Sequence, residues 1–302
     1  MKVLVTGGAG FIGSRLVERL VRKDIGPVVA LDNLFRNSWE KLRSYRGGVE
    51  IIEGDVRDRG LVSAAMKEVS VVFHLAAQSN VLGAAAELDY SFSTNVGGTF
   101  EVLRAAREAG VARVVFTSSR EVYGEPERLP VSEDAPLRPK NAYGASKVAG
   151  ELYARVFAGD GLPVSILRLA NVYGPGDKGR VIPIFLERIA RKEPLVIFGG
   201  QQVLDFIWIE TVMDALLAAA FGELPDGPVN VGSGEGVTLQ RLAERIAACA
   251  DSQVEIRIDP ARSIETTRFV ADVTRMRQKL GINPGPDALA WLPMLQGETV
   301  QA

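Results

Sequence analysis

A tyrosine and a lysine four residues apart are the first residues of this sequence whose types and spacing suit chemistry. Tyr143 and Lys147 occur in the segment YGASK, at the start of a predicted helix. A spacing of four places both side chains on one face of a helix. An ammonium group beside a phenol lowers the pKa of that phenol. A phenolate formed in this way can remove a proton from an alcohol while hydride leaves the carbon.

Two residues upstream could serve the same reaction. The segment TSSREVYG follows an apolar run, 114–116, that predicts a buried strand. Ser119 closes this strand, and its hydroxyl could hold the reacting alcohol by a hydrogen bond. Glu121 could act as a second base, or it could form a salt bridge with Arg120 that fixes the turn. The residues alone leave both roles of Glu121 open.

A glycine-rich turn joins the first predicted strand to the first predicted helix. In TGGAGFIGS, Gly7 allows a tight turn, Gly10 lets a pyrophosphate approach the backbone, and Gly13 lets the helix pack closely on the strand. The N-terminus of the helix then faces the phosphates with unpaired N–H groups. Asp32 closes the second strand, where a carboxylate accepts both ribose hydroxyls of NAD and repels the 2′-phosphate of NADP. The sequence therefore predicts bound NAD, whose nicotinamide charge would lower the Tyr143 pKa further.

Two residues after the third predicted strand have two possible roles. Asp55 and Val56 could contact the adenine of the dinucleotide. Asp55 could instead cap the helix that follows, since aspartate is favoured at that position. The sequence does not decide between these roles.

Strands and helices alternate along most of the chain. Strands are predicted at 2–6, 27–32, 49–53, 70–75, 112–118 and 163–169, with helices between them such as 12–22 and 90–108. Short strands that are apolar on both faces, separated by helices, predict an α/β fold with a doubly wound Rossmann-type parallel sheet. Beyond about residue 175 Pro and Gly become frequent, with helices predicted at 181–191, 210–221 and 238–250. We expect a Rossmann domain over 1–175 and a smaller substrate lobe over 176–302, interleaved with it.

Composition narrows the class of protein. The chain has 302 residues, about half of them apolar, and a formal net charge of −2, which does not indicate a nucleic-acid or anionic-membrane partner. No apolar run approaches the roughly 18 residues that cross a bilayer. The single cysteine, Cys249, cannot form an internal disulfide, and the single histidine, His74, has no visible partners for a metal site. A cytoplasmic protein without a metal is the simplest expectation.

Taken together, these motifs resemble the extended short-chain dehydrogenase/reductase family, in particular its NAD-dependent nucleotide-sugar epimerases and dehydratases. The resemblance runs from Met1 to about Leu280. It is carried by TGGAGFIGS, LDNL, GDVRD, VFHLAAQ, NVGGT, SSREVYG, YGASK and RLANVYGPG, in the family's order and spacing.

The resemblance implies further site residues. Asn95 has the place of an asparagine that supports the active site. The additional cofactor contacts that it implies are Phe11, Ile12, Asn33, Leu75, Ala76, Ala77, Thr94, Ser118 and Ala170. The substrate contacts that it implies are Ser79, Ser119, Asn171, Val196, Phe198 and Arg262, the last of these on the diphosphate of a nucleotide-diphosphate sugar. It also implies a homodimer.

The family mechanism begins with oxidation at C4 of the sugar. Tyr143 would deprotonate the C4 hydroxyl while hydride passes to NAD, and an epimerase then returns hydride to the other face of the 4-keto sugar. Dehydratases and decarboxylases share the first step, and dehydratases of the family often use a glutamate at the place of Glu121. Their preceding aspartic acid is here Arg120, which has no dissociable proton near pH 7. We therefore expect a 4-epimerase of a UDP-hexose or UDP-uronic acid type, in which Glu121 only shapes the site.

One position departs from the family pattern. Leu204 stands where an arginine usually binds the substrate diphosphate. Arg262 is the first candidate to supply that charge, and Lys178 and Arg180 in GDKGR are the second. Loss of substrate binding, giving a non-catalytic NAD-binding sensor, is the alternative class.

Overall fold

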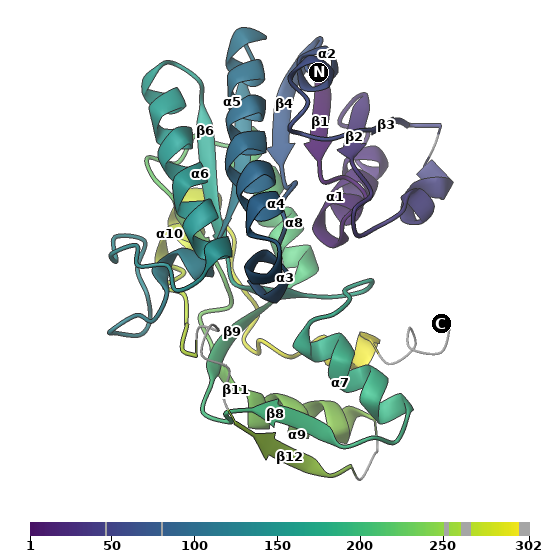
Figure 1. The fold of residues 1–302 in the computed structure, drawn as a ribbon, viewed down its shortest axis with the longest axis vertical. Coiled ribbons are helices and arrows are strands. Elements are labelled where there is room, and N and C mark those ends of the chain that lie inside the picture. Colours follow the sequence, from purple (N-terminus) through teal and green to yellow (C-terminus); the bar gives the residue numbers. More distant parts are fainter. Residues whose placement is uncertain (46, 80, 251–253, 261–266, 296–302) are drawn as a thin grey trace.

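The computed structural model describes residues 1–45, 47–79, 81–250, 254–260 and 267–295. Within these residues, seven parallel strands form a sheet in the order β10-β6-β5-β4-β1-β2-β3 (Figure 1). The strands are β1 (Lys2–Thr6), β2 (Val28–Asp32), β3 (Val49–Glu53), β4 (Val69–His74), β5 (Arg113–Ser119), β6 (Val164–Leu169) and β10 (Val229–Val231). The order reverses between β1 and β4, which is the switch point where such sheets bind ligands. The predicted Rossmann-type fold is confirmed.

Helices cover both faces of this sheet. On one face lie α1 (Phe11–Arg22) and α8 (Ile209–Phe221), which share one apolar core with the strands. On the other lie α2 (Arg59–Ala65), α5 (Thr99–Glu108) and α6 (Ala142–Gly159), which form a second core. Strand residues such as Val3 and Leu4 point alternately into the two cores, so both faces are buried, as the continuous apolar runs predicted.

The predicted helix over 90–108 is present, but it is not α-helical throughout. Short helices α3 (Val81–Ala86) and α4 (Leu88–Phe92) come first, and a π-helical turn, Ser93–Gly98, separates α4 from α5. Within the turn the Asn95 side chain bonds both backbone groups of Gln78. The Thr99 hydroxyl donates to the Asn95 carbonyl at 2.6 Å. The sequence periodicity could not show this π-helical turn.

The chain beyond residue 175 builds smaller units and also contributes to the main sheet. Strands β7 (Asn171–Tyr173), β9 (Val203–Trp208) and β11 (Gly236–Thr238) form one small sheet, and β8 (Leu195–Phe198) and β12 (Ile256–Asp259) form another. Helices α7 (Val181–Ala190) and α9 (Leu239–Cys249) lie beside β8 and β12, below the large sheet in Figure 1. Helix α10 (Thr274–Leu280) packs against β10 and α8. Since β10 and α8 belong to the large layer, the second part of the chain is not spatially separate.

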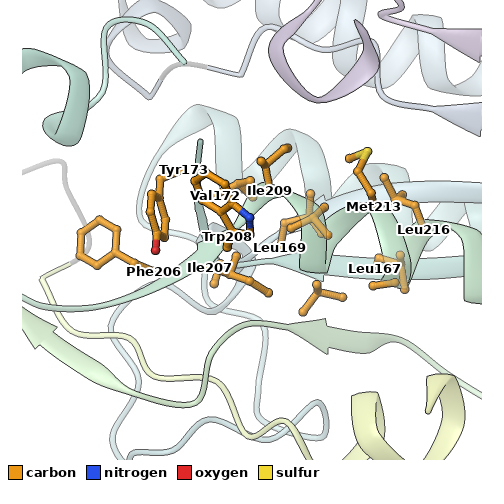
Figure 2. Close-up of a cluster of buried hydrophobic side chains, with 14 of the residues drawn as sticks. Leu167, Leu169, Val172, Tyr173, Phe206, Ile207, Trp208, Ile209, Met213 and Leu216 are labelled. Atoms are coloured by element: carbon orange, nitrogen blue, oxygen red, sulfur yellow. The ribbon is translucent and has the colours of Figure 1, made fainter. Parts of the chain in front are cut away.

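A buried cluster joins the seven-stranded sheet to the small sheet of β7, β9 and β11 (Figure 2). Leu167 and Leu169 of β6 meet Met213 and Leu216 of α8, and the Tyr173 ring packs edge-on against Trp208 at 5.3 Å. Further members lie on β7, β9 and the start of α8: Val172, Phe206, Ile207, Trp208 and Ile209. This packing fixes β7, which begins with Asn171, relative to the carboxyl ends of the main strands.

No helix in the described parts of the chain has both the length and the apolar character needed to span a membrane.

Candidate active site

A cavity of about 580 Å³ opens at the carboxyl ends of the parallel strands. The glycine turn, the ends of β2, β4, β5 and β6, the start of α6 and strands β8 and β9 all contribute to its wall. Of the site residues that the sequence predicts, Arg262 lies outside the described residues and Asp55 is not part of the wall. Asn95 is not part of the wall either, but its side chain bonds the backbone of the wall residue Gln78. All the others line this one cavity.

The glycine turn has the geometry that a pyrophosphate needs. Gly7 has a φ of +71°, in the left-handed region that suits glycine. A Cβ on Gly13 would lie 2.0 Å from the carbonyl oxygen of Gly7, so any larger residue would push the helix away from the strand. Gly10 precedes α1 without a side-chain cap, so the first N–H groups of the helix are left for a ligand.

The carboxylate of Asp32 is held at the place expected for a ribose contact. Its oxygens accept the N–H groups of Ala9 at 3.0 Å and Leu34 at 2.9 Å. Burial raises the pKa of Asp32, and these two backbone bonds lower it in part. The orientation is therefore fixed by the backbone, and Arg36 lines the same end of the cavity.

Five residues of the cavity wall have a buried polar atom without a hydrogen-bond partner among the described residues. The atoms are the Thr94 hydroxyl, the amide oxygens of Gln78 and Gln202, Arg120 Nη1 and Asp177 Oδ2. Buried groups of this kind cost free energy unless a partner satisfies them, so they indicate a polar ligand here. Thr94 was predicted to contact the cofactor, whereas Gln78 was missed although it ends the VFHLAAQ motif. Together with the glycine turn and Asp32, these groups fit NAD.

The structure excludes one of the two roles predicted for Asp55. The capping alternative was wrong, because Asp58 caps α2 by accepting the N–H of Leu61. The Asp55 carboxylate bonds Arg57 and Asn33, and the Arg57 guanidinium lowers its pKa to about 2. Val56 lines the cavity, and the contact of Asp55 and Val56 with adenine stays a prediction.

The predicted catalytic residues come together at the ends of β5 and α6. The Tyr143 phenol and the Ser119 hydroxyl share a hydrogen bond. The Lys147 ammonium donates to the Thr117 carbonyl at 2.9 Å and lies 5.8 Å from the centre of the Tyr143 ring. All three line the cavity.

The predicted lowering of the Tyr143 pKa is not a property of the polypeptide alone. Burial raises the pKa of Tyr143 to about 12, against smaller opposing effects of which the charge of Arg180 is the largest. Lys147 is itself buried, and burial lowers its pKa to about 8. A phenolate therefore requires a further positive charge in the site, and the nicotinamide charge is the one that the sequence argument invoked.

The Glu121 carboxylate is occupied by two neighbours. Its Oε1 lies 2.9 Å from the Arg120 guanidinium, and its Oε2 accepts the amide of Asn141 at 2.7 Å. Asn141 also caps α6 through the N–H of Gly144, and so holds the helix that carries Tyr143. These contacts agree with a Glu121 that fixes the turn. The capping asparagine directly before AYGASK was a signal that sequence reasoning missed.

Substrate-side residues surround Asn171. Its Oδ1 accepts from Arg120 Nε at 3.2 Å, and its Nδ2 donates to the Asp205 carbonyl at 2.9 Å. Leu204 is buried in the wall nearby. Arg180, on the loop before α7, pairs with Asp177 at 3.0 Å and lies 5.5 Å from the Phe11 ring.

A buried network behind the site was also missed. Glu151, one turn beyond Lys147, is fully buried and accepts two bonds from Arg168, at 2.8 and 2.6 Å. Its Oε1 also accepts the hydroxyl of Ser118, the predicted cofactor residue, at 2.6 Å. This network ties α6 to the strand end that carries Ser119.

The fold and this site define an extended short-chain dehydrogenase/reductase: a doubly wound sheet, a dinucleotide turn and a Ser-Tyr-Lys set at the strand ends. The model of the NAD dependent epimerase/dehydratase family matches residues 3–232, and the chain belongs to that family.

Individual relatives agree with this assignment over nearly the whole chain. A UDP-glucose 4-epimerase of Mycolicibacterium smegmatis is 37% identical over 94% of this chain and 94% of its own. UDP-glucuronic acid decarboxylase 5 of Arabidopsis thaliana is 30% identical over 98% of this chain and 88% of its own. The solved UDP-glucose 4-epimerase of Thermus thermophilus in complex with NAD is 33% identical, with a TM-score of 0.91 over 100% of both chains.

Proposed function

We propose that this protein is an NAD-dependent 4-epimerase of a nucleotide-diphosphate sugar. The observation that carries the proposal is the single cavity that joins the glycine turn and Asp32 to Ser119, Tyr143 and Lys147. Relatives named as UDP-glucose 4-epimerases, one of them solved with NAD, support the same activity. NAD, when bound, supplies a hydride acceptor that can return the hydride within the same turnover.

The chain's own residues would hold and deprotonate the sugar. Ser119 binds the C4 hydroxyl, and Tyr143 takes its proton as general base. Lys147 keeps positive charge next to the phenol, and Thr117 holds its ammonium in place. Because the proton must return at the end, Tyr143 then acts as the acid that protonates the inverted C4 oxygen.

Glu121 is the residue on which the alternative activity depends. A dehydratase or decarboxylase of the family would need to break a bond at C5 of a 4-keto sugar. A relative named as a UDP-glucuronic acid decarboxylase supports this alternative. The salt bridge to Arg120 and the bond from Asn141 favour an epimerase, since they engage both carboxylate oxygens. Incubation with UDP-, dTDP-, GDP- and CDP-sugars, followed by mass spectrometry and NMR of the products, tests the activity. C4 epimers are expected, and 4-keto-6-deoxy sugars or pentoses would contradict the proposal.

The same proposal includes the organisation and assembly of the protein. Residues 1–175 would bind NAD, and residues 176–302 would mainly bind the substrate. A homodimer is proposed through the exposed apolar side chains of α4 and α6, where Phe92 and Val156 are each 67% exposed and Leu152 is 54% exposed. Light scattering after gel filtration tests this, and Val156→Glu should yield monomers. A cytoplasmic location is part of the same proposal.

A further inference from the structure

Arg120 has one nitrogen that nothing in the described parts of the chain satisfies. Its side chain is 12% exposed and lines the cavity. Its Nε donates to Asn171, and one terminal nitrogen, Nη2, pairs with Glu121. The other terminal nitrogen, Nη1, is buried without a hydrogen-bond partner. A buried guanidinium N–H in this state costs free energy, so a ligand acceptor is expected beside it.

The position of Arg120 indicates which part of the ligand it meets. It directly follows Ser119, and its charge is close enough to act on the Tyr143 phenol. These two residues mark the hydroxyl that reacts, so the Arg120 side chain lines the cavity near the place of the reacting carbon. On a hexose bound in this way, the substituents next to C4 are the C3 hydroxyl and the group on C5.

Charge favours an anionic acceptor. The cavity wall contains five cationic side chains and three carboxylates. The cations are Arg36, Arg120, Lys147, Lys178 and Arg180, and the carboxylates are Asp32, Glu121 and Asp177. Hydrogen bonds from a guanidinium to a carboxylate are stronger and shorter than those to a neutral hydroxyl. Arginine also forms a planar fork that can bridge Glu121 and a second carboxylate.

We propose that Arg120 recognises a carboxylate on C5 of the sugar and makes the site prefer a nucleotide-linked hexuronic acid over a neutral hexose. The inference rests on the proposed function and names its substrate class. Glu121 and Asn171 both orient the guanidinium for this contact, so Asn171 acts on the substrate through Arg120. In this role Glu121 is not the base that removes a C5 proton.

Binding to the NAD-loaded protein carrying Tyr143→Phe tests the inference without turnover. The probes are UDP, UDP-glucose and UDP-glucuronic acid, measured by calorimetry. Adding Arg120→Gln should raise the Kd of UDP-glucuronic acid by about tenfold or more, equivalent to about 1.4 kcal/mol. The Kd values of UDP and UDP-glucose should change by less than about threefold.

Three further variants separate recognition from folding. Arg120→Gln alone removes a cation from beside the buried Glu121 carboxylate, which can destabilise the protein. The same comparison is therefore made between Glu121→Gln and Glu121→Gln/Arg120→Gln, in which that carboxylate is replaced by an amide. Arg138→Gln, on an arginine whose side chain is 67% exposed and pairs with Glu127, is the matched control and should leave all three affinities unchanged.

Each outcome decides one question. Selective loss of UDP-glucuronic acid affinity supports the inference. Equal loss for UDP would assign Arg120 to the diphosphate, and equal loss for UDP-glucose would assign it to a hydroxyl, so either overturns the inference. If the wild-type holoenzyme binds none of the three UDP probes, the inference is overturned, and the dTDP-, GDP- and CDP-sugars then decide the proposed function.

Discussion

His74 should make the protein less stable at mildly acidic pH. It is the only histidine of the chain and is buried to 1% exposure. Its Nδ1 accepts from the Thr6 hydroxyl at 2.8 Å, and its Nε2 donates to the Thr99 hydroxyl at 2.9 Å, because Thr99 itself donates to Asn95. Burial, and secondarily the charge of Lys147, lower the pKa of His74 from 6.5 to about 3.

The sign and size of the effect follow from linkage. Between pH 6.5 and 3 the unfolded chain binds a proton at this residue that the folded chain does not bind. The contribution of His74 to the free energy of unfolding is therefore fully present above pH 6.5. It decreases as the pH is lowered below this value. From pH 7 to pH 5 the loss from this residue is about 2 kcal/mol.

Urea unfolding at pH 7 and pH 5 measures this loss. In His74→Asn the residue no longer titrates, so the variant should lose about 2 kcal/mol less than the wild type over the same interval. Other groups contribute equally to both proteins and cancel. Equal losses in the two proteins, or an NMR signal of this histidine that titrates near pH 6.5 in the folded state, would refute the account of a neutral structural histidine.

Three other perturbations have defined outcomes. Glu151→Gln leaves Arg168 buried without its carboxylate and should cost about 3–5 kcal/mol in urea unfolding, whereas Glu151→Gln/Arg168→Met should recover most of it; a loss below about 1 kcal/mol would contradict the buried pair. Fluorescence titration of the apoprotein with NAD and with NADP should show a higher affinity for NAD, and Asp32→Ala should reduce this difference in affinity. Equal affinities in the wild type would exclude the proposed role of Asp32. Gly13→Ala places a Cβ 2.0 Å from the Gly7 carbonyl and should abolish tight NAD binding in the same titration; unchanged binding would mean that the turn can relax.

The parts of the site that local sequence encodes were predictable. Gly7, Gly10 and Gly13 carry their constraint in their spacing, and Tyr143 and Lys147 share a helix face because they are four residues apart. The parallel sheet followed from short apolar runs that alternate with helices. In each case the determining interaction lies within a few residues along the chain.

The contacts that depend on tertiary packing were not predictable. Nothing in the spacing of Glu151 and Arg168 indicates that they meet, and the Arg120–Asn171 bond likewise joins residues far apart in sequence. The π-helical turn at Asn95 was not predicted either, and the Asn95 side chain there bonds Gln78, 17 residues away in the sequence. The Tyr143 pKa differed from expectation because burial, which the sequence does not quantify, outweighs the nearby cations.

The reaction in deuterated water tests the central claim most directly. The NAD-loaded protein is incubated with UDP-glucose and with UDP-glucuronic acid, and the products are analysed by NMR. The account predicts inversion at C4 with no deuterium at C5, in the wild type and in Glu121→Gln with most of its kcat retained. Deuterium at C5, a 4-keto-6-deoxy product or a decarboxylated pentose, each lost in Glu121→Gln, would show that Glu121 is a base and that the protein is not an epimerase.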